Sequence, residues 1–115
     1  MKTKRFNSIH VLRETYYQLP KFLFNDEFKG LSNNARIAYA LLKERHLLSV
    51  KNDWVNKIGE VYLNYRREDL EKILGMSNKT VINIFKELKA NNLLEEERLG
   101  QGKPNRIYLL QISKV

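Results

Sequence analysis

The stretch REDLEKILGMSNKTVINIFKELKANN, residues 67–92, decides the fold of this chain. Its first eight residues predict a short helix over 67–74, and Gly75-Met76-Ser77 predict a tight turn. Residues 78–91 follow with apolar positions at helical spacing, so they predict a longer amphipathic helix. Two short helices joined by a three-residue turn are the pattern of a helix-turn-helix.

Two β-strands are expected after this helix pair. Residues 93–99 and 106–112 are the expected strands, the second of them rich in apolar and β-forming side chains, and the basic, glycine-rich tip 100–105 separates them. A hairpin in this position forms a wing. The order therefore predicts a protein that reads a DNA groove with the second helix and contacts the flanking DNA with the hairpin.

The second helix has signals at its start and along one face. Ser77 is a good N-cap, and Gly75 supplies the permissive backbone of a tight turn. One stripe of apolar residues is expected to face the core: Val81, Ile84, Phe85 and Leu88.

The opposite face of that helix carries amide and amine side chains, namely Asn78, Lys79, Asn83, Lys86 and Lys89, with Thr80 at the leading edge. Amides pair with adenine edges, lysine reaches guanine or phosphate, and a threonine methyl contacts thymine. A solvated helix face has a similar composition, and it is the wing that favours DNA binding. We expect base readout by Asn78, Lys79, Thr80 and Asn83, with Lys86 on the neighbouring backbone.

Basic residues elsewhere complete the expected DNA contacts. Wing residues Arg98, Gln101, Lys103 and Arg106 are expected on phosphates or in the adjacent minor groove. The N-terminal cluster Lys2, Lys4 and Arg5 could add a non-specific backbone contact. One acidic run, Glu95-Glu96-Glu97, interrupts this trend, and it could screen a sheet edge or pair with cations on a neighbouring segment.

Composition indicates one soluble, cytoplasmic domain with a polyanionic partner. Twenty-one lysines and arginines face 13 acids among 115 residues, a formal charge of +8. There is no cysteine, which excludes disulfides and thiolate chemistry. No apolar run approaches the roughly 20 residues of a membrane helix, and no signal-peptide core follows the polar start.

The remaining segments predict an α+β, mostly helical domain. A short helix with Pro20 at its first position is expected within 19–24. Ser32 is expected to cap a helix from Asn33 to about Leu48. Four residues of this helix are expected to face inward: Ala35, Ala38, Leu41 and Leu42. Alternation at Val61, Leu63 and Tyr65 predicts a short strand that pairs with the wing.

The N-terminal residues 1–18 are expected to form an arm, and residues 19–115 the winged-helix domain. Residues 6–17 lack a helical period, so an extended arm or an irregular strand pair is predicted. Their apolar surface exceeds what a solvated tail needs, and it should pack on a partner subunit or on the domain's own flank. The dimer-arm residues are Phe6, Ile9, Val11, Tyr16 and Tyr17.

The sequence offers no enzyme site. His10 and His46 lie far apart without cysteine or carboxylate at metal-ligand spacing, so each is expected to be a surface or packing residue, and no metal or cofactor is expected. The stretch Gly100-Gln101-Gly102-Lys103 lacks the spacing and the following Ser or Thr of a phosphate loop. Trp54 and the six tyrosines are scattered, which favours packing over stacking on single-stranded bases.

Five stretches resemble, in this order, the N-terminal domain of RepA-type plasmid replication initiators of Gram-positive bacteria. They are YQLPKFLF (17–24), LSNNARIAYALL (31–42), NDW (52–54), GEVYL (59–63) and GKPNRIYL (102–109). The resemblance covers residues from about 6 to 112. One departure from the pattern is Arg66-Arg67 before Glu68, where a Ser or Thr cap is usual.

The resemblance implies binding to repeated double-stranded sequences at a plasmid origin, recruitment of host replication proteins and frequent dimerisation. It also implies a further C-terminal domain, so we expect these 115 residues to be a piece of a longer initiator. Three alternatives stay open: a transcriptional repressor of similar fold, a winged-helix module that binds an acidic protein, and a nuclease. Asn78 and Asn83 on the exposed helix face disfavour the second, and the lack of a catalytic constellation disfavours the third.

Overall fold

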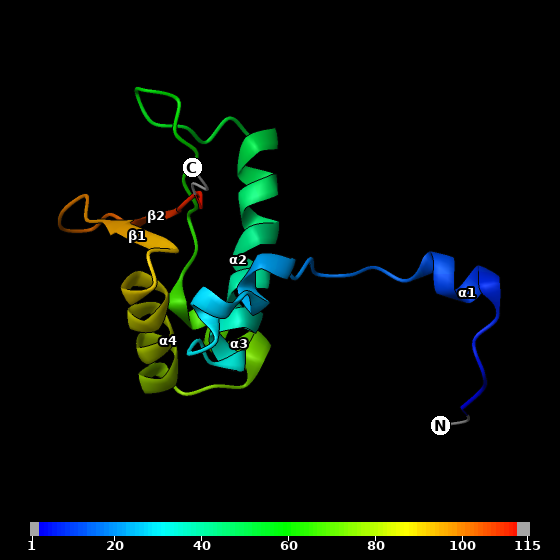
Figure 1. Cartoon of the computed structure of the whole chain (residues 1–115). Helices are drawn as coiled ribbons and strands as arrows, with labels where there is room; N and C mark the ends of the chain where they lie inside the picture. The colour runs from blue at the N-terminus through cyan, green and yellow to red at the C-terminus, as the bar shows by residue number, and fades with distance from the viewer. Residues whose placement is uncertain (1–2, 113–115) are drawn as a thin grey trace.

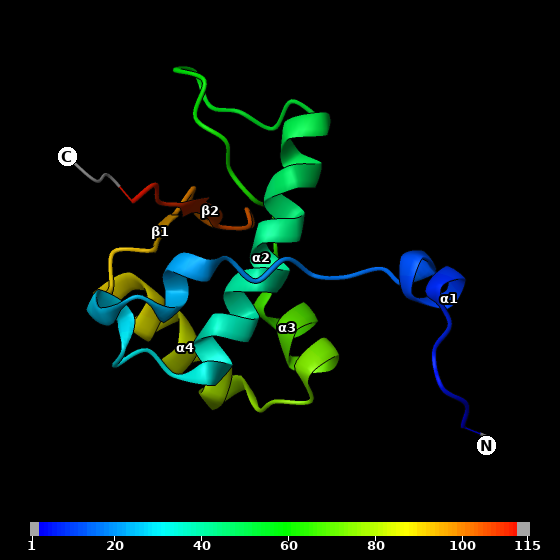
Figure 2. The ribbon, with the colours of Figure 1, turned by 45° about the vertical axis from the view of Figure 1, so that its right-hand side comes forward.

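The computed structural model describes residues 3–112 as a small domain with a projecting N-terminal arm (Figures 1 and 2). The helices of residues 33–51, 67–74 and 78–90 form the body, and the hairpin of residues 94–109 lies above the last of these helices and beside the first (Figure 1). The elements in chain order are α1 (Ser8–Arg13), the 3₁₀ helices η1 (Lys21–Phe24) and η2 (Asp26–Phe28), α2 (Asn33–Lys51), α3 (Arg67–Leu74), α4 (Asn78–Ala90), β1 (Leu94–Glu97) and β2 (Arg106–Leu109).

The helices of the body begin and end at local signals. The Ser32 hydroxyl accepts a hydrogen bond from the Ala35 amide at 3.1 Å, which caps α2 as predicted. The helix runs beyond the expected end near Leu48, because the chain holds no glycine or proline between Ala35 and Asn52. Helix α3 has its predicted bounds, and α4 ends at Ala90, one residue early, because the Asn91 side chain turns back onto the Glu87 carbonyl at 2.8 Å.

The wing is an antiparallel pair in which Leu94 faces Leu109 and Glu97 faces Arg106. Both strands are shorter than predicted, although the Leu110 amide still donates to the Leu93 carbonyl at 3.0 Å beyond the regular ladder. The glycines of the tip carry positive φ angles, which ends regular pairing there.

The predicted strand around Val61 to Tyr65 is wrong as a regular strand, but its pairing with the wing is confirmed. Leu63 and Ile107 exchange both backbone hydrogen bonds, at 2.7 and 3.1 Å. Val61 pairs instead with Val55 in a tight local hairpin. The segment is thus divided between two partners, and neither pairing extends far enough to form a ladder.

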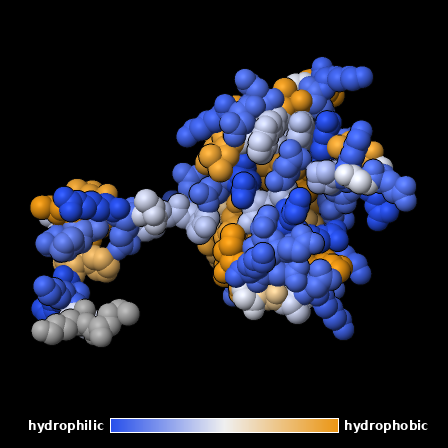
Figure 3. Space-filling view, turned by 180° about the vertical axis from the view of Figure 1, so that it is seen from behind, coloured by the Kyte–Doolittle hydropathy of each residue, from blue (hydrophilic) through white to orange (hydrophobic). Residues whose placement is uncertain are grey.

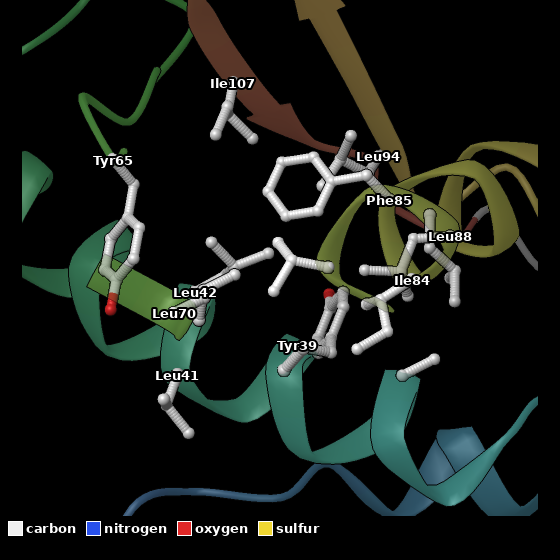
Figure 4. Packing of buried hydrophobic residues seen from close by; sticks show 14 of the residues in the cluster. Tyr39, Leu41, Leu42, Tyr65, Leu70, Ile84, Phe85, Leu88, Leu94 and Ile107 are labelled. Atoms are coloured by element: carbon white, nitrogen blue, oxygen red, sulfur yellow. The ribbon is translucent and has the colours of Figure 1, made fainter. Parts of the chain in front are cut away.

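The core lies where α2, α4 and the hairpin meet (Figure 4). The predicted stripe of α4 and the predicted inward residues of α2 are all buried. Tyr39 and Tyr65 belong to this core, which confirms packing as the role of those two tyrosines. The 3₁₀ helices η1 and η2 are fixed to α2, because the Arg36 guanidinium donates to the carbonyls of Leu23 and Phe28 at 2.9 Å each.

The arm differs from the prediction of an extended or strand-like segment, because residues 8–13 form helix α1. The Asn7 side chain accepts from the His10 amide at 2.9 Å, and this cap starts the helix. Six residues are less than two helical turns, so no apolar period could be read from the sequence. The short helix expected at Pro20 is a 3₁₀ turn, with Pro20 just before its first residue.

Helix α1 of the arm does not pack on the domain's own flank. Helix α1 contains no buried residue, and Phe6, Ile9, Val11, Tyr16 and Tyr17 are all exposed. Figures 1 and 2 show α1 held away from the body at the end of an extended segment. Of the two expected arm contacts, only the one with a partner subunit remains a prediction.

Candidate nucleic-acid interface

The turn between α3 and α4 fixes where the candidate recognition helix starts. Gly75 adopts a left-handed conformation with φ 63° and ψ 37°, and the Met76 amide donates to the Glu71 carbonyl at 3.0 Å. The Ser77 hydroxyl then accepts from the Thr80 amide at 3.2 Å. These contacts hold the first turn of α4 in one orientation, as a base-reading helix requires.

Three of the four predicted base-reading residues present free polar groups. Asn78, Lys79 and Asn83 are exposed, and Asn78 has only a long hydrogen bond of 3.4 Å to Glu71. Thr80 is half-buried, and its hydroxyl lies 2.9 Å from that of Ser77. The Thr80 hydroxyl therefore completes the cap, which leaves its methyl group for contact with a base.

The lysines of α4 fall into two groups. Lys79 and Lys86 are exposed and form no ion pair within residues 3–112, so both are available to phosphate. Lys89 instead pairs with Glu96 of β1, whose carboxylate also contacts the Arg67 guanidinium at 2.9 Å. Lys89, which the sequence placed on the polar face, thus has a partner within the protein.

Glu96 is the polar link between the wing and the helices. Its side chain is only 9% exposed and receives Arg67 from α3 and Lys89 from α4. Burial alone would raise the pKa of Glu96, but the hydrogen bond from Lys89 and the charges of Arg67 and Lys89 lower it below its ordinary value. Glu96 of the acidic run therefore pairs with cations of neighbouring segments, which is one of the two roles predicted for that run.

A second link ties α4 to the start of α2. The Glu87 carboxylate accepts hydrogen bonds from the Ser32 amide and from the Ser32 hydroxyl, the latter at 2.8 Å. A carboxylate at a helix N-terminus also meets the positive end of the helix dipole. This contact and the Lys89–Glu96 pair both lie near the C-terminal end of α4, and they hold that end of the recognition helix against the domain.

The wing tip is a tight turn that presents polar side chains. Gly100 and Gly102 have φ angles of 105° and 76°, and the Lys103 amide donates to the Gly100 carbonyl at 3.3 Å. Arg98, Gln101 and Lys103 are exposed, as their predicted DNA contacts require. The side-chain amide of Asn105 donates a hydrogen bond to the Glu96 carboxylate at 3.4 Å, which connects the tip to Glu96.

Arg106 has a different environment from the other wing cations. Its guanidinium lies 4.3 Å from the centre of the Tyr62 ring and 3.8 Å from the Glu97 carboxylate. Tyr62 in turn packs edge-on against Tyr108, with ring centres 6.3 Å apart. Arg106 therefore stabilises the outer face of the hairpin, and its charge is less available to DNA than the charge of Lys103.

Two exposed cations at the two ends of α3 were missed by sequence reasoning. Lys72 lies in the last turn of α3, two positions after buried Leu70, and Arg66 immediately precedes the same helix. The first helix of a helix-turn-helix crosses the DNA backbone. The polar face of α3 was the available signal, and both residues now join the candidate backbone contacts.

Residues 15–115 match the family described as replication initiator protein A (RepA) N-terminus. The chain belongs to the RepA N-terminus family. This confirms the resemblance drawn from the five sequence stretches, and the winged-helix fold agrees with the solved relatives of this RepA domain.

Similar proteins include solved structures and a longer chain. Structures described as "N-Terminal domain of DNA binding protein", "Structure of Rep-DNA complex" and "Structure of MDR initiator" have TM-scores of 0.78, 0.77 and 0.75. Their sequence identities are 36%, 36% and 42%, and the matches cover 99%, 97% and 97% of this chain and 88%, 87% and 89% of theirs. A "41 kDa protein" of Lactobacillus helveticus is 36% identical over 115 residues, which are 94% of this chain and 33% of that protein. The RepA domain thus spans about a third of that relative.

No group of three histidine, cysteine or acidic side chains lies together within residues 3–112 in a way that could hold a metal ion. Within the same residues, no helix has both the length and the apolar character to cross a membrane. His10 is exposed on α1, whereas His46 is half-buried on α2. Of the N-terminal basic cluster, Lys2 lies outside the described residues, and Lys4 and Arg5 are exposed.

Proposed function

We propose that this RepA domain binds repeated double-stranded sequences at a plasmid origin and thereby initiates replication of the plasmid. The observation that carries the proposal is the exposed amide and lysine face of α4, a helix capped at its start by Ser77 and tied to the domain near its end by Glu87 and by the Lys89–Glu96 pair. The Rep-DNA complex and the initiator among the similar structures support the same activity. A net charge of +8 supplies the attraction to DNA.

The contacts divide between two parts of the domain. Asn78, Lys79 and Asn83, with the methyl group of Thr80, read base edges in the major groove. The remaining polar residues hold the DNA backbone or the adjacent minor groove: Lys86, Lys72 and Arg66 on the helices, and Arg98, Gln101 and Lys103 on the wing, with a smaller share for Arg106.

The domain acts as part of a larger assembly. The exposed apolar surface of the arm supports a homodimer, because a monomeric soluble protein gains nothing from such a surface. The greater length of the Lactobacillus relative supports a further C-terminal part that recruits host replication proteins. In this proposal the domain itself is not an enzyme, takes no cofactor and works in the cytoplasm, where plasmid DNA resides.

Footprinting of the full 115-residue chain on plasmid origin DNA tests the proposal. We expect protection of each repeat at low micromolar protein or below, and loss of protection in Asn83→Ala before loss of non-specific retention. Asn64→Ala is the matched control, because Asn64 is an exposed asparagine outside the helix-turn-helix. Protection of a promoter but not of the repeats would favour a repressor, and uniform weak protection of all DNA would refute sequence-specific binding.

A further inference from the structure

A groove of about 890 Å³ opens on the side of the domain that the DNA contacts do not use. Its walls come from η1, α2, the loop before Val61, both wing strands and the segment that follows β2. No lining residue belongs to α3 or α4. The groove has the size of a ligand pocket and is not part of the proposed recognition surface.

The walls of the groove combine apolar and acidic side chains. Its apolar lining is provided by Phe22, Val61, Leu109, Leu110 and Ile112. Glu60 and Glu95 are exposed at the groove and form no ion pair within the described part of the chain, whereas Glu96 is already neutralised by Arg67 and Lys89. An acidic groove repels phosphate, so its ligand has to be cationic and partly apolar.

Two basic side chains also line the groove, but the groove remains acidic. Lys43 is half-buried on α2, one turn from His46. Burial lowers the pKa of His46, and the charge of Lys43 lowers it further, so His46 is uncharged at neutral pH. The free acids therefore outnumber the single cation.

The N-terminal arm has the complementary composition. Ile9, Val11 and Leu12 are exposed on α1, Leu12 to 84%, although a cluster of apolar side chains of this size is normally buried. The flanking charges are mostly positive: Lys4, Arg5 and Arg13, against Glu14. Figure 3 shows this apolar surface on the arm, separated from the rest of the molecule by the extended tether.

We propose that the acidic and apolar groove receives helix α1 of a second copy of the chain. The inference rests on the homodimer of the proposed function and adds the place where the arm binds. In this arrangement the apolar side chains of α1 contact Leu109, Leu110 and Ile112, and two arginines of the arm, Arg13 of α1 and Arg5 before it, lie near Glu60 and Glu95. The DNA-reading face of each subunit stays free, since the groove includes no residue of α4.

The tether directs the arm toward another molecule. Pro20 fixes its own φ at −60°, and a residue before proline is restricted to extended backbone, so Leu19 continues the straight path. Glu14 is also extended, and residues 3–29 contain no glycine at which the chain could reverse tightly. Figure 2 shows the tether crossing α2 and leaving the domain on the side opposite the wing.

Cysteine cross-linking tests the contact directly, because the natural chain has no cysteine. A Leu12→Cys chain is mixed with a Gln111→Cys chain of different tag mass, since Gln111 is an exposed residue of the groove. A disulfide needs Cα atoms within about 7 Å, so the mixed dimer should form at least about tenfold faster than with Ile37→Cys, an exposed α2 position outside the groove. Equal rates would overturn the proposal.

A chain with both Leu12→Cys and Gln111→Cys separates the two ways of filling the groove. Cross-linked dimers are expected, whereas a cross-linked monomer would show that each arm occupies its own groove and would refute the second copy. Binding of the same variants to origin and random duplexes is measured in parallel. Absence of cross-links with intact origin preference would remove only the docking inference, and absence of origin preference in the natural chain would remove the proposed function.

Charge exchange provides an independent check. Glu60→Lys with Glu95→Lys should weaken dimerisation in sedimentation equilibrium by about tenfold, and Arg5→Glu with Arg13→Glu in the same chain should restore most of the loss. Glu44→Lys is the control, because Glu44 is an exposed acid of α2 outside the groove. No loss in the groove variant, or an equal loss in the control, would overturn the proposal.

Discussion

Helix α4 and the wing carry the two halves of the proposed DNA contact, but they are held in place by different forces. Four side chains of α4 are fully or almost fully buried, at exposed fractions of 0–3%. The wing is attached by its pairing with Leu63, by buried Leu94 and Ile107, and by the ion pairs of Glu96. The helix therefore depends mainly on apolar packing, with polar contacts near its C-terminal end, whereas the position of the wing depends more on charge and so on pH and salt.

Phe85→Ala should produce the largest effect on this comparison, because it removes the largest buried side chain of α4. We expect the free energy of unfolding to fall by about 3 to 5 kcal/mol, with parallel loss of origin and random binding. Denaturant unfolding followed by circular dichroism measures the first quantity. Lys86→Ala, on the exposed face of the same helix, should change stability by less than about 0.5 kcal/mol. A similar loss of unfolding free energy in Phe85→Ala and Lys86→Ala would mean that apolar packing does not hold α4.

Asn83→Ala should affect specificity without affecting the fold. If Asn83 meets a base edge, binding should weaken by about 1 to 3 kcal/mol at one position of the site, with non-specific affinity nearly unchanged. Competition binding with single-base variants of the repeat identifies that position. An equal loss on random DNA would place Asn83 on the backbone.

Glu96→Gln should loosen the wing by a smaller amount, about 1 to 2 kcal/mol of unfolding free energy, because Arg67 and Lys89 are partly exposed and can be solvated. The folded-state pKa of Glu96 lies below its ordinary value of 4.5, so its contribution is present above that pH and is lost as the pH falls through the folded value. Melting curves of the natural chain and the variant should thus converge as the pH falls below the folded-state pKa of Glu96. A difference that persists in acid would show that the charge of Glu96 is not the cause.

Lys103→Ala should have the smallest effect, visible mainly through salt. The slope of log affinity against log salt should fall by about one unit on every sequence, as counterion release requires for one lost phosphate contact. Arg106→Ala should lower the slope by less, because its guanidinium stacks on Tyr62, and it should destabilise the hairpin. If Arg106→Ala matches Lys103→Ala in salt slope with no loss of stability, the stacked position of Arg106 is not kept on DNA.

Local signals explain which parts of the fold could be predicted. Ser32, Gly75 and Ser77 act within a few residues of their own position, so the caps and the bounds of α3 followed from the sequence. The buried stripe of α4 followed from its period. Helix α1 is too short to show an apolar period. The segment near Leu63 does not form the predicted regular strand, because its two pairings involve different partners.

The finer features of the site depend on residues that are distant in sequence. Glu96 meets Arg67 across 29 positions, and Arg106 stacks on Tyr62 from another part of the chain. No spacing rule predicts such partners, because only the packing of α3, α4 and the hairpin brings them together. For the same reason the sequence assigned Lys89 to the exposed polar face and missed the groove behind the wing.

One titration tests the division between helix and wing most directly. Fluorescence anisotropy measures the affinity of the natural chain, Asn83→Ala and Lys103→Ala for an origin repeat and for a scrambled duplex over a range of salt concentrations. We predict that Asn83→Ala loses the preference for the repeat at an unchanged salt slope, and that Lys103→Ala keeps the preference with a slope lower by about one unit. The reverse pattern, with preference lost in Lys103→Ala and kept in Asn83→Ala, would show that the wing reads the sequence and would contradict the assignment of base readout to α4.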